Sequence, residues 1–428
     1  MTDRFIKALS SAEGVADWKL TETNTLSREL FYVLDKLETS RTADITEYQA
    51  TVYTDKDGKR GSASFSVYDF MTEEELASAI ADHVYAASFA MNPYYDLPGK
   101  EELPAAEEGA GLADTPFDEL ITRVVRAVFA ADTYREGMLS ATEFFLTKTA
   151  RRVVNSRGAY VSSVTSAGRV ELIPSWEKNG EEVEIYHMMD FSSFDAEAIT
   201  KEVDEQLRLA RARFEAKPLP VKEGLKVIIQ DDDAGRLFSY FTGDLSYAAK
   251  YMKSNKSEPG DCVQGDNITG DRLTLRLVPY YPNAFASHPF DDDGVILHDT
   301  LLIDNGIAAA RHGSWQYGRY LGIERPTGVL PVTVVEPGTK GFDEMAKEPY
   351  VRCVRFSGLQ VEPNSGYFGG EVRLGFYFDG KKEIPVTGFS ISGNMNVSRG
   401  TMRLSSETVT RSRYHGPKYL EIPDMTIL

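Results

Sequence analysis

The sequence predicts an α+β fold made of two domains. Helical and strand-like patterns alternate over residues 1–217, whereas short strand-like runs and tight turns dominate residues 218–428. Pro218 and Pro220 follow a long helical pattern and mark the boundary between these regions. We therefore expect an N-terminal domain of helices on a mixed or antiparallel sheet. The C-terminal domain is predicted to be mostly antiparallel and barrel-like, with a few helices.

Turn signals and apolar spacing predict the N-terminal elements. Strand-like runs on either side of Asp57-Gly58 predict a hairpin, because this dipeptide suits a two-residue turn. Thr72 and Glu75 match a capping box, and the apolar residues that follow predict a helix over residues 72–91. The same spacing predicts another helix over residues 115–132.

Two further segments complete the N-terminal domain. Residues 105–114 show little periodicity, and we expect a loop there. A long helix follows, because Ser193 or Asp195 can cap its start and apolar residues recur along one face until the chain approaches Pro218.

The C-terminal region begins with a strand and a helix and continues with hairpins. Residues 225–230 predict a short apolar strand, and residues 231–253 predict a single helix with an acidic start. Asn305-Gly306 and Asp379-Gly380 predict the turns of two hairpins. Repeated hairpins favour an antiparallel sheet that curls on itself.

The bulk composition limits the classes of partner. Lys and Arg number 47, Asp and Glu number 65, and the formal net charge is -18. A surface this acidic repels phosphate backbones and anionic lipid, so we expect neither nucleic acid nor a membrane as a partner. The chain shows no secretory signal and no apolar run that could cross a bilayer, which favours a cytoplasmic protein.

The two cysteines, Cys262 and Cys353, form neither a disulfide framework nor a CxxC pair. Cys353 lies in a strand-like run and is predicted to be a buried structural thiol. The sequence contains no GxSxG, Walker A, GxGxxG or HExxH string. The usual motifs for hydrolysis or nucleotide binding are therefore missing.

The string SHPFDDDGV, residues 287–295, concentrates three carboxylates before a glycine. Asp291, Asp292 and Asp293 could bind a hard cation or a substrate amine, because such groups take oxygen ligands. They could instead cap backbone amides in an Asp-rich turn at Gly294. The string lacks the alternating ligands of an EF-hand loop, and its composition favours the turn.

Three histidines, His288, His298 and His312, lie near this string in the sequence. Zinc binds imidazole, but its sites usually show tighter local spacing than these residues have. We expect the three to be hydrogen-bonding residues rather than zinc ligands. His187 is predicted to be structural.

Several strings along the chain have the order and spacing of one family. They are DGKRGSASFS, AASFAMNPYYDLPG, VVNSRG, FDDDGV followed by LLIDNGI, GFSISGNM and KYLEIPDMTI. Together they resemble, nearly from end to end, the TldD/PmbA family. Its members are often labelled modulators of DNA gyrase and are studied as peptide-maturing metalloproteases.

The resemblance implies the place of a metal site. The family pairs two kinds of chain, and the TldD type carries an H-E-x-x-x-H motif whose zinc site a downstream cysteine completes. Here the motif positions fall on Ser239, Tyr240 and Asp244, and only Gly243 agrees with the active pattern. Serine is a poor zinc ligand, tyrosine cannot act as the carboxylate base, and one aspartate does not make a site. No cysteine follows Cys353.

The resemblance therefore implies a PmbA-type, or TldE-type, subunit without a metal or other cofactor of its own. Zinc is expected only in a TldD-like partner, which would cut an extended peptide inside a cavity shared by the heterodimer. The implied role of this chain is to shape that cavity and gate access to it.

The same resemblance places one group of residues near the inner surface of the C-terminal domain, where they could orient a peptide amine or a basic side chain. We expect charge reversal of its carboxylates to weaken peptide processing while leaving folding intact. The substrate-cavity candidates are His288, Asp291, Asp292, Asp293 and Gly294.

Two other functions stay open from the sequence. One is a stand-alone peptidase with an unconventional metal site, made by Asp244 with His288 or His298. The other is a homodimer that binds a peptide or protein without cleaving it. In each case, any effect on DNA gyrase is expected to be indirect, because the acidic surface disfavours DNA.

Overall fold

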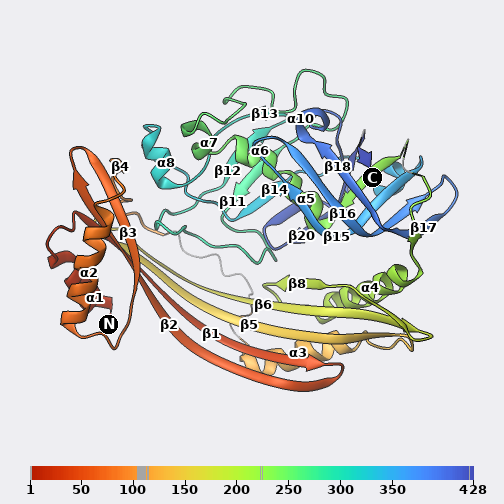
Figure 1. Cartoon of the computed structure of the whole chain (residues 1–428), viewed down its shortest axis with the longest axis horizontal. Coiled ribbons are helices and arrows are strands. Elements are labelled where there is room, and N and C mark those ends of the chain that lie inside the picture. Colours follow the sequence, from red (N-terminus) through yellow and green to blue (C-terminus); the bar gives the residue numbers. More distant parts are fainter. Residues whose placement is uncertain (1, 104–111, 113–114, 222, 224, 424) are drawn as a thin grey trace.

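The computed structural model describes residues 2–103, 112, 115–221, 223, 225–423 and 425–428. Most of the loop predicted for residues 105–114 lies outside these described residues. Figure 1 shows a long curved sheet below and a second, strand-rich region above it. The predicted α+β class is confirmed by helices and mostly antiparallel sheets in the described chain.

The N-terminal region is built on one antiparallel sheet of eight strands in the order β4-β3-β2-β1-β5-β6-β7, with β8 also paired to β6. The hairpin predicted at Asp57-Gly58 is confirmed, and both turn residues have positive φ, 51° and 71°. The strands are β1 (Asp17–Val33), β2 (Lys36–Lys56), β3 (Lys59–Val67), β4 (Asn92–Pro93), β5 (Gly137–Asn155), β6 (Tyr160–Lys178), β7 (Glu181–Glu184) and β8 (His187–Phe191).

Four helices cover one face of this sheet, a pair at each end. α1 (Thr2–Ser11) and α2 (Glu73–Ala87) pack on a cluster that includes Leu20, whereas α3 (Phe117–Phe129) and α4 (Ala196–Glu215) pack on one that includes Leu30. Leu20 and Leu30 are an even number of residues apart in β1, so their side chains point to the same face. The opposite face meets the C-terminal region through residues such as Lys19 of β1, and α4 contacts that region as well.

The predicted helix starts are present. At α2, the Thr72 hydroxyl accepts from the Glu75 amide (3.1 Å), and the Glu75 carboxylate accepts from the Thr72 amide (2.8 Å). At α4, the Asp195 carboxylate accepts from the Ala198 amide (3.0 Å), so the second of the two predicted caps is the one used. Each bond satisfies an amide that the first helical turn leaves without a partner.

The C-terminal region holds two open sheets rather than one closed barrel. A nine-stranded sheet and a six-stranded sheet share a single apolar core, which includes Val227, Leu275, Val335 and Val351. The nine strands are β9 (Lys217–Pro218), β10 (Lys226–Gln230), β15 (Tyr350–Val361), β16 (Tyr367–Phe378), β17 (Glu383–Thr387), β18 (Phe389–Asn394), β19 (Arg403–Leu404), β22 (Tyr419–Ile422) and β23 (Thr426–Ile427).

The second sheet contains the hairpin predicted at Asn305-Gly306, whereas the turn at Asp379-Gly380 joins β16 to β17 in the first. The division of the chain at 217/218 stays a prediction. The six strands are β11 (Leu275–Val278), β12 (Thr300–Asp304), β13 (Ile307–Ala308), β14 (Val332–Val335), β20 (Thr408–Arg411) and β21 (Tyr414–Pro417). Short helices α8 (Trp315–Tyr320), α9 (Phe342–Met345) and α10 (Met395–Ser398) connect strands of this region.

The single helix predicted for residues 231–253 is wrong, because three short helices replace it: α5 (Asp231–Leu237), α6 (Ser239–Asp244) and α7 (Tyr247–Tyr251). Ser246 causes the second break. Its hydroxyl donates to the Gly243 carbonyl (2.8 Å) and accepts from the Ala249 amide (3.0 Å), so it ends one helix and caps the next.

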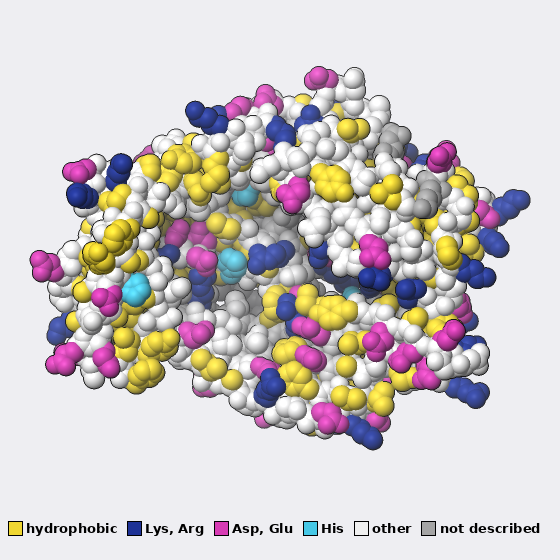
Figure 2. All heavy atoms as spheres, viewed as in Figure 1, with side chains coloured by type: hydrophobic (Ala, Val, Ile, Leu, Met, Phe, Trp, Pro, Cys, Tyr) yellow, Lys and Arg dark blue, Asp and Glu magenta, His cyan; other side chains and the backbone are white. Residues whose placement is uncertain are grey.

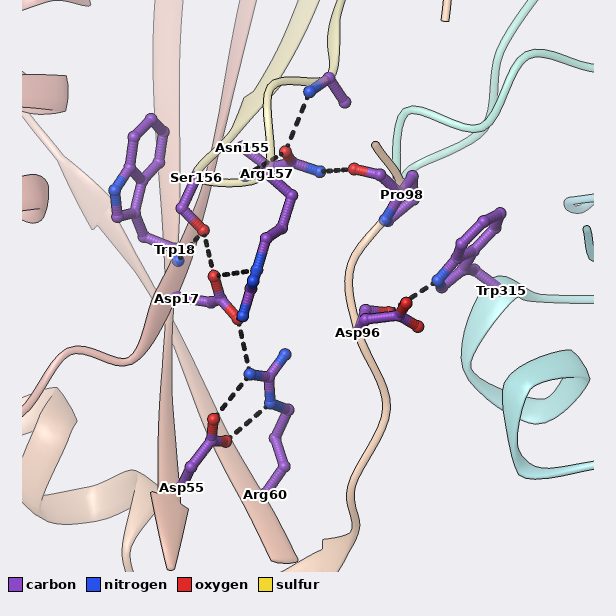
Figure 3. A network of polar contacts seen from close by, with 11 residues as sticks. Asp17, Trp18, Asp55, Arg60, Asp96, Pro98, Asn155, Ser156, Arg157 and Trp315 are labelled. Carbon is purple, nitrogen blue, oxygen red and sulfur yellow. Dashed lines mark hydrogen bonds and ion pairs between the residues drawn. The ribbon is translucent and has the colours of Figure 1, made fainter. Parts of the chain in front are cut away.

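The segment of residues 96–98, here called the connector, is hydrogen-bonded to both regions (Figure 3). The Pro98 carbonyl accepts from the Asn155 amide nitrogen (2.8 Å) on the N-terminal side. The Asp96 carbonyl accepts from the Trp315 indole (2.7 Å). The Asp96 carboxylate accepts from Arg319 Nε (2.7 Å) on α8. The string AASFAMNPYYDLPG therefore contains a structural tie between the regions.

Beside this connector in Figure 3, the N-terminal sheet contains a network of ion pairs. The Asp17 carboxylate accepts from Arg60 Nη2 (2.6 Å), Arg157 Nε (2.7 Å) and the Ser156 hydroxyl (2.6 Å). The Asp55 carboxylate accepts two further bonds from Arg60, one from Nε and one from Nη2 (both 2.8 Å). Burial opposes ionisation of Asp17, but these donors outweigh it and lower the pKa of the carboxyl. The network ties β1 to the β2–β3 hairpin and to the turn after β5.

A second tie joins α4 and β8 to the C-terminal sheets. The Glu202 carboxylate lies 2.8 Å from His187 Nε2 and 3.4 Å from Arg411 Nη1 of β20. The Arg355 guanidinium of β15 donates to the Gln206 side chain of α4. Burial disfavours the Glu202 charge, but His187 and Arg411 lower the pKa of this carboxyl to about 2. His187 therefore has the structural place that was predicted for it.

Glu202→Gln is expected to lower the free energy of unfolding at pH 7 by about 3 kcal/mol, because it removes the half-buried negative charge that lies against His187 and Arg411. A carboxyl whose folded pKa is depressed stabilises the fold above its unfolded pKa, near 4.5, and stops doing so as pH falls towards 2. Urea unfolding should therefore show the two proteins converging at low pH. Exposed Glu197→Gln on the same helix is the control, and an equal loss in both variants would contradict the assignment.

Candidate functional site

The residues at the metal-motif positions lie on α6 and its flanks. Tyr240 and Asp244 are buried, and Ser239 and Gly243 are half-buried. The Tyr240 hydroxyl donates to Asn396 Oδ1 (2.8 Å) on α10, and Asp244 Oδ1 accepts from the backbone amide of Lys256. A Cβ at Gly243 would come within 2.8 Å of Pro363 Cβ, so the glycine permits close approach of that loop.

Two cations surround the Tyr240 ring. Lys256 Nζ lies 4.7 Å from the ring centre and donates to the Pro363 carbonyl (3.0 Å), and Arg399 Nη1 donates to the Tyr240 hydroxyl (3.4 Å). Burial lowers the pKa of Lys256, with Asp244 opposing and Arg399 adding to the effect. Burial also raises the pKa of Tyr240, so the phenol stays protonated at neutral pH. We call Tyr240, Asp244, Lys256, Asn396 and Arg399 the α6 site.

The donor set of the α6 site does not fit zinc. Zinc binds imidazole, thiolate and carboxylate groups, whereas this site offers a protonated phenol, one carboxylate already bonded to an amide, and two cations that repel a metal ion. Across the described residues, no group of three or more His, Cys, Asp and Glu side chains could hold a metal ion. No step of a reaction is therefore assigned to zinc in this chain.

Neither cysteine is part of the α6 site. Cys353 lies in β15 opposite Ile229 of β10, and burial raises the pKa of its thiol far above the ordinary value. This is the buried structural thiol that was predicted. The Cys262 thiol donates to the Gly265 carbonyl (3.2 Å).

The Asp-rich string forms the turn that its composition favoured. Asp291 is buried, and its carboxylate accepts from the amides of Asp293 (2.9 Å), Val295 (3.0 Å) and Val329 (3.0 Å). Burial and the Asp293 charge raise its pKa to about 6, against the lowering effect of the amides. Asp291 thus holds the loop in shape.

The next residues of the string dock on the N-terminal sheet. Asp293 pairs with Lys19 Nζ of β1 (2.7 Å), and Asp292 pairs with Arg151 of β5. At Gly294, φ is 80°, and an added Cβ would lie 3.2 Å from Val153 of β5. The string is therefore a contact between the two regions, and of its carboxylates that of Asp292, with 94% side-chain exposure, is the most open to solvent.

The predicted histidines are dispersed and hydrogen-bonded locally. His288 Nδ1 lies 2.8 Å from the Ala286 carbonyl oxygen, and His312 Nε2 lies 2.9 Å from the Thr242 carbonyl oxygen. His298 is exposed, 3.9 Å from Glu101. Burial lowers the pKa values of His288 and His312, so both are neutral at pH 7.

The candidates fall into two groups in space. The Asp-rich string contacts the N-terminal sheet, whereas α6 lies beside α10, on the side of the C-terminal region away from that sheet (Figure 1). Sequence reasoning missed Lys256, Asn396 and Arg399. The only available signal was the string GFSISGNM, which ends one residue before Asn396.

The molecule is hollowed between its two regions, and acidic, basic and histidine side chains are visible in the hollow (Figure 2). Threonines line the sheet face that points this way: Thr25, Thr149 and Thr165 lie directly opposite one another in β1, β5 and β6. Thr149 shares a face with Arg151, which reaches Asp292 of the C-terminal region. The hollow therefore has a hydroxyl-lined floor.

Residues 222–428 match the model of the PmbA/TldA metallopeptidase C-terminal domain. A metalloprotease of Methanothermobacter thermautotrophicus is 28% identical over 147 residues, which are 31% of this chain and 32% of the relative. The metalloprotease PmbA of Escherichia coli O157:H7 is 26% identical over 208 residues, 47% of this chain and 45% of the relative. The matches thus span less than half of these curated relatives.

Solved structures share the whole fold. TldE of Thermococcus kodakarensis superposes with a TM-score of 0.78 at 16% identity, covering 100% of this chain and 99% of the other. A proposed DNA gyrase modulator of Thermotoga maritima gives 0.79 at 17% identity, with coverages of 100% and 99%. The fold and the C-terminal match define a chain related to metallopeptidases. Its residues 222–428 match the PmbA/TldA metallopeptidase C-terminal domain, and its whole fold is similar to that of TldE.

Among the described helices, none combines the length and apolar character needed to cross a bilayer. Many apolar side chains of the helices and strands given above lie instead in three buried hydrophobic clusters.

Asp291→Ala is expected to lower the free energy of unfolding by roughly 2 kcal/mol, because three loop amides lose their acceptor. Charge reversal at Asp291 is expected to disturb folding as well. The expectation that charge reversal leaves folding intact therefore applies to Asp292 only. The matched Asp292→Ala variant should leave the urea midpoint nearly unchanged, since an exposed ion pair contributes little. A midpoint shift in the Asp292 variant alone would contradict this division of roles.

Proposed function

We propose that this chain is the non-catalytic, zinc-less subunit of a heterodimeric TldD/TldE-type metallopeptidase that cleaves or matures peptides. The observation that carries the proposal is the α6 site. Where an active chain needs two imidazoles and a carboxylate base, this chain has Ser239, Tyr240 and Asp244, and two cations lie beside them. Such a chain needs a zinc-bearing partner if the pair is to hydrolyse amides.

The comparisons support this proposal at the level of the family. One relative is named a metalloprotease PmbA, and one structure of the same fold is named TldE. The TldD-like partner, with H-E-x-x-x-H and a downstream cysteine, comes from the family resemblance. For this chain, the TldD-like partner is therefore proposed.

In the proposed complex, this chain shapes the cavity in which an extended peptide lies. The hollow and its threonine floor suit a peptide backbone, because hydroxyl groups both donate and accept hydrogen bonds without selecting a side chain. Asp292 is the carboxylate best placed to meet a peptide amine or basic side chain, since its side chain is 94% exposed. His288, Asp291, Asp293 and Gly294 would act by holding that loop in place.

An affinity pull-down from native lysate, with metal analysis of the bound and free chain, tests the proposal. We expect a TldD-like chain to co-purify, zinc to accompany that partner, and peptide hydrolysis to require both chains. Stoichiometric zinc and peptidase activity in the isolated chain would contradict the proposal and favour a stand-alone enzyme. Self-association without a zinc-bearing partner would contradict it in favour of a peptide-binding homodimer.

A further inference from the structure

We infer that the α6 site, which lies apart from the hollow on the other side of the C-terminal region, binds the C-terminal carboxylate of a peptide. This inference deepens the proposed function, because it names the part of the substrate that the chain would hold. The position that carries a metal ion in active relatives would here carry an anion. Lys256 and Arg399 supply the positive charge, the first over the Tyr240 ring and the second at its hydroxyl.

The two cations are short of negative partners. Acidic residues outnumber basic ones by 65 to 47, yet within the described chain neither Lys256 nor Arg399 forms an ion pair with a carboxylate. Lys250 and Arg311, on the flanking segments, do pair with Glu258. What distinguishes Lys256 and Arg399 from other cations without an ion pair is that both contact the same buried residue, Tyr240.

The site also has unused hydrogen-bond donors. A lysine ammonium has three donors and an arginine guanidinium has five. In the contacts described, Lys256 Nζ uses one on the Pro363 carbonyl, and Arg399 uses one on the Tyr240 hydroxyl. The Lys256 side chain is exposed and that of Arg399 is half-buried, so a ligand can approach from solvent.

The charge balance favours a carboxylate over other ligands. Asp244 lies close enough to Lys256 to oppose the lowering of its pKa, so the two cations and one anion leave a net charge of about one. A carboxylate carries one negative charge and accepts parallel hydrogen bonds from a guanidinium. A metal ion would be repelled. A peptide supplies the matching group at its C-terminus or on an acidic side chain.

The neighbouring loop limits what else enters the site. A Cβ at Gly366 would lie 3.0 Å from the Tyr240 ring and 2.8 Å from the Asn396 amide nitrogen, so this loop already fills one side. Asn394 and Asn396 both donate to the Ser365 carbonyl, at 3.3 Å and 2.7 Å. The loop that contains Gly366 therefore packs against one side of the site, and a ligand can reach the cations from the solvent-exposed side of Lys256.

Calorimetric titration of N-acetylated pentaalanine into the isolated chain tests the inference without a partner or turnover. The peptide with a free carboxylate should bind roughly tenfold more tightly than its C-terminal amide, because charged hydrogen bonds are lost in the amide. The preference should vanish in Lys256→Gln/Arg399→Gln. The matched control, Lys347→Gln/Arg325→Gln, removes an exposed lysine and arginine elsewhere and should retain it.

A third peptide, amidated and with one internal glutamate, identifies the source of the carboxylate. Tighter binding than the plain amide would support the carboxylate site and assign it to acidic side chains as well. Equal binding of the free acid and its amide to the unaltered chain, or no binding of either, would overturn the inference. That result needs no variant, and it stands apart from the proposed function, which depends on zinc and a partner.

Discussion

The proposed function depends on a buried phenol, Tyr240, at the position where the active pattern has a carboxylate. Tyr240 is anchored by its hydrogen bond to Asn396 and is flanked by Lys256 and Arg399. A neutral ring can be buried in an apolar core at little cost, whereas the carboxylate base of an active site needs a metal-bound water beside it. Two cations lie beside this phenol, and each of them further disfavours a metal ion. The site therefore differs from a zinc centre in charge as well as in ligands.

The rest of the molecule holds the two regions in a fixed relation around a hollow. Three separate ties do this: the connector through Asp96, the Asp-rich loop on β1 and β5, and the half-buried pair of Glu202 with Arg411. Removing one partner is expected to cost most at Glu202 and little at the exposed Asp292. This arrangement suits a subunit that presents a wall to a substrate and does no chemistry itself.

Much of the fold was readable from local sequence, because local rules decide it. Asp57-Gly58 specifies its hairpin through positive φ at both residues, and Thr72 with Glu75 specifies a helix start. The single helix predicted over residues 231–253 was wrong at its second break because the Ser246 side chain caps α7 instead of continuing the helix. The absence of two histidines and a glutamate at the motif positions was also visible in sequence.

The remaining site residues could not be found in this way. Lys256 and Arg399 are far from Tyr240 in sequence, and only the tertiary fold brings them to its ring. Likewise, nothing local shows that Asp293 meets Lys19, which lies near the other end of the chain. The role of Asp291 in the turn is mostly local, because two of its three amide donors, Asp293 and Val295, lie within four residues of it and only Val329 is distant.

The most direct test of the central claim is a zinc titration of the metal-free, isolated chain, followed by calorimetry and by an assay of peptide cleavage in the same samples. The account predicts no stoichiometric site of micromolar or better affinity and no cleavage. One equivalent of tightly bound zinc, lost on replacement of Asp244 and accompanied by peptide hydrolysis, would contradict it.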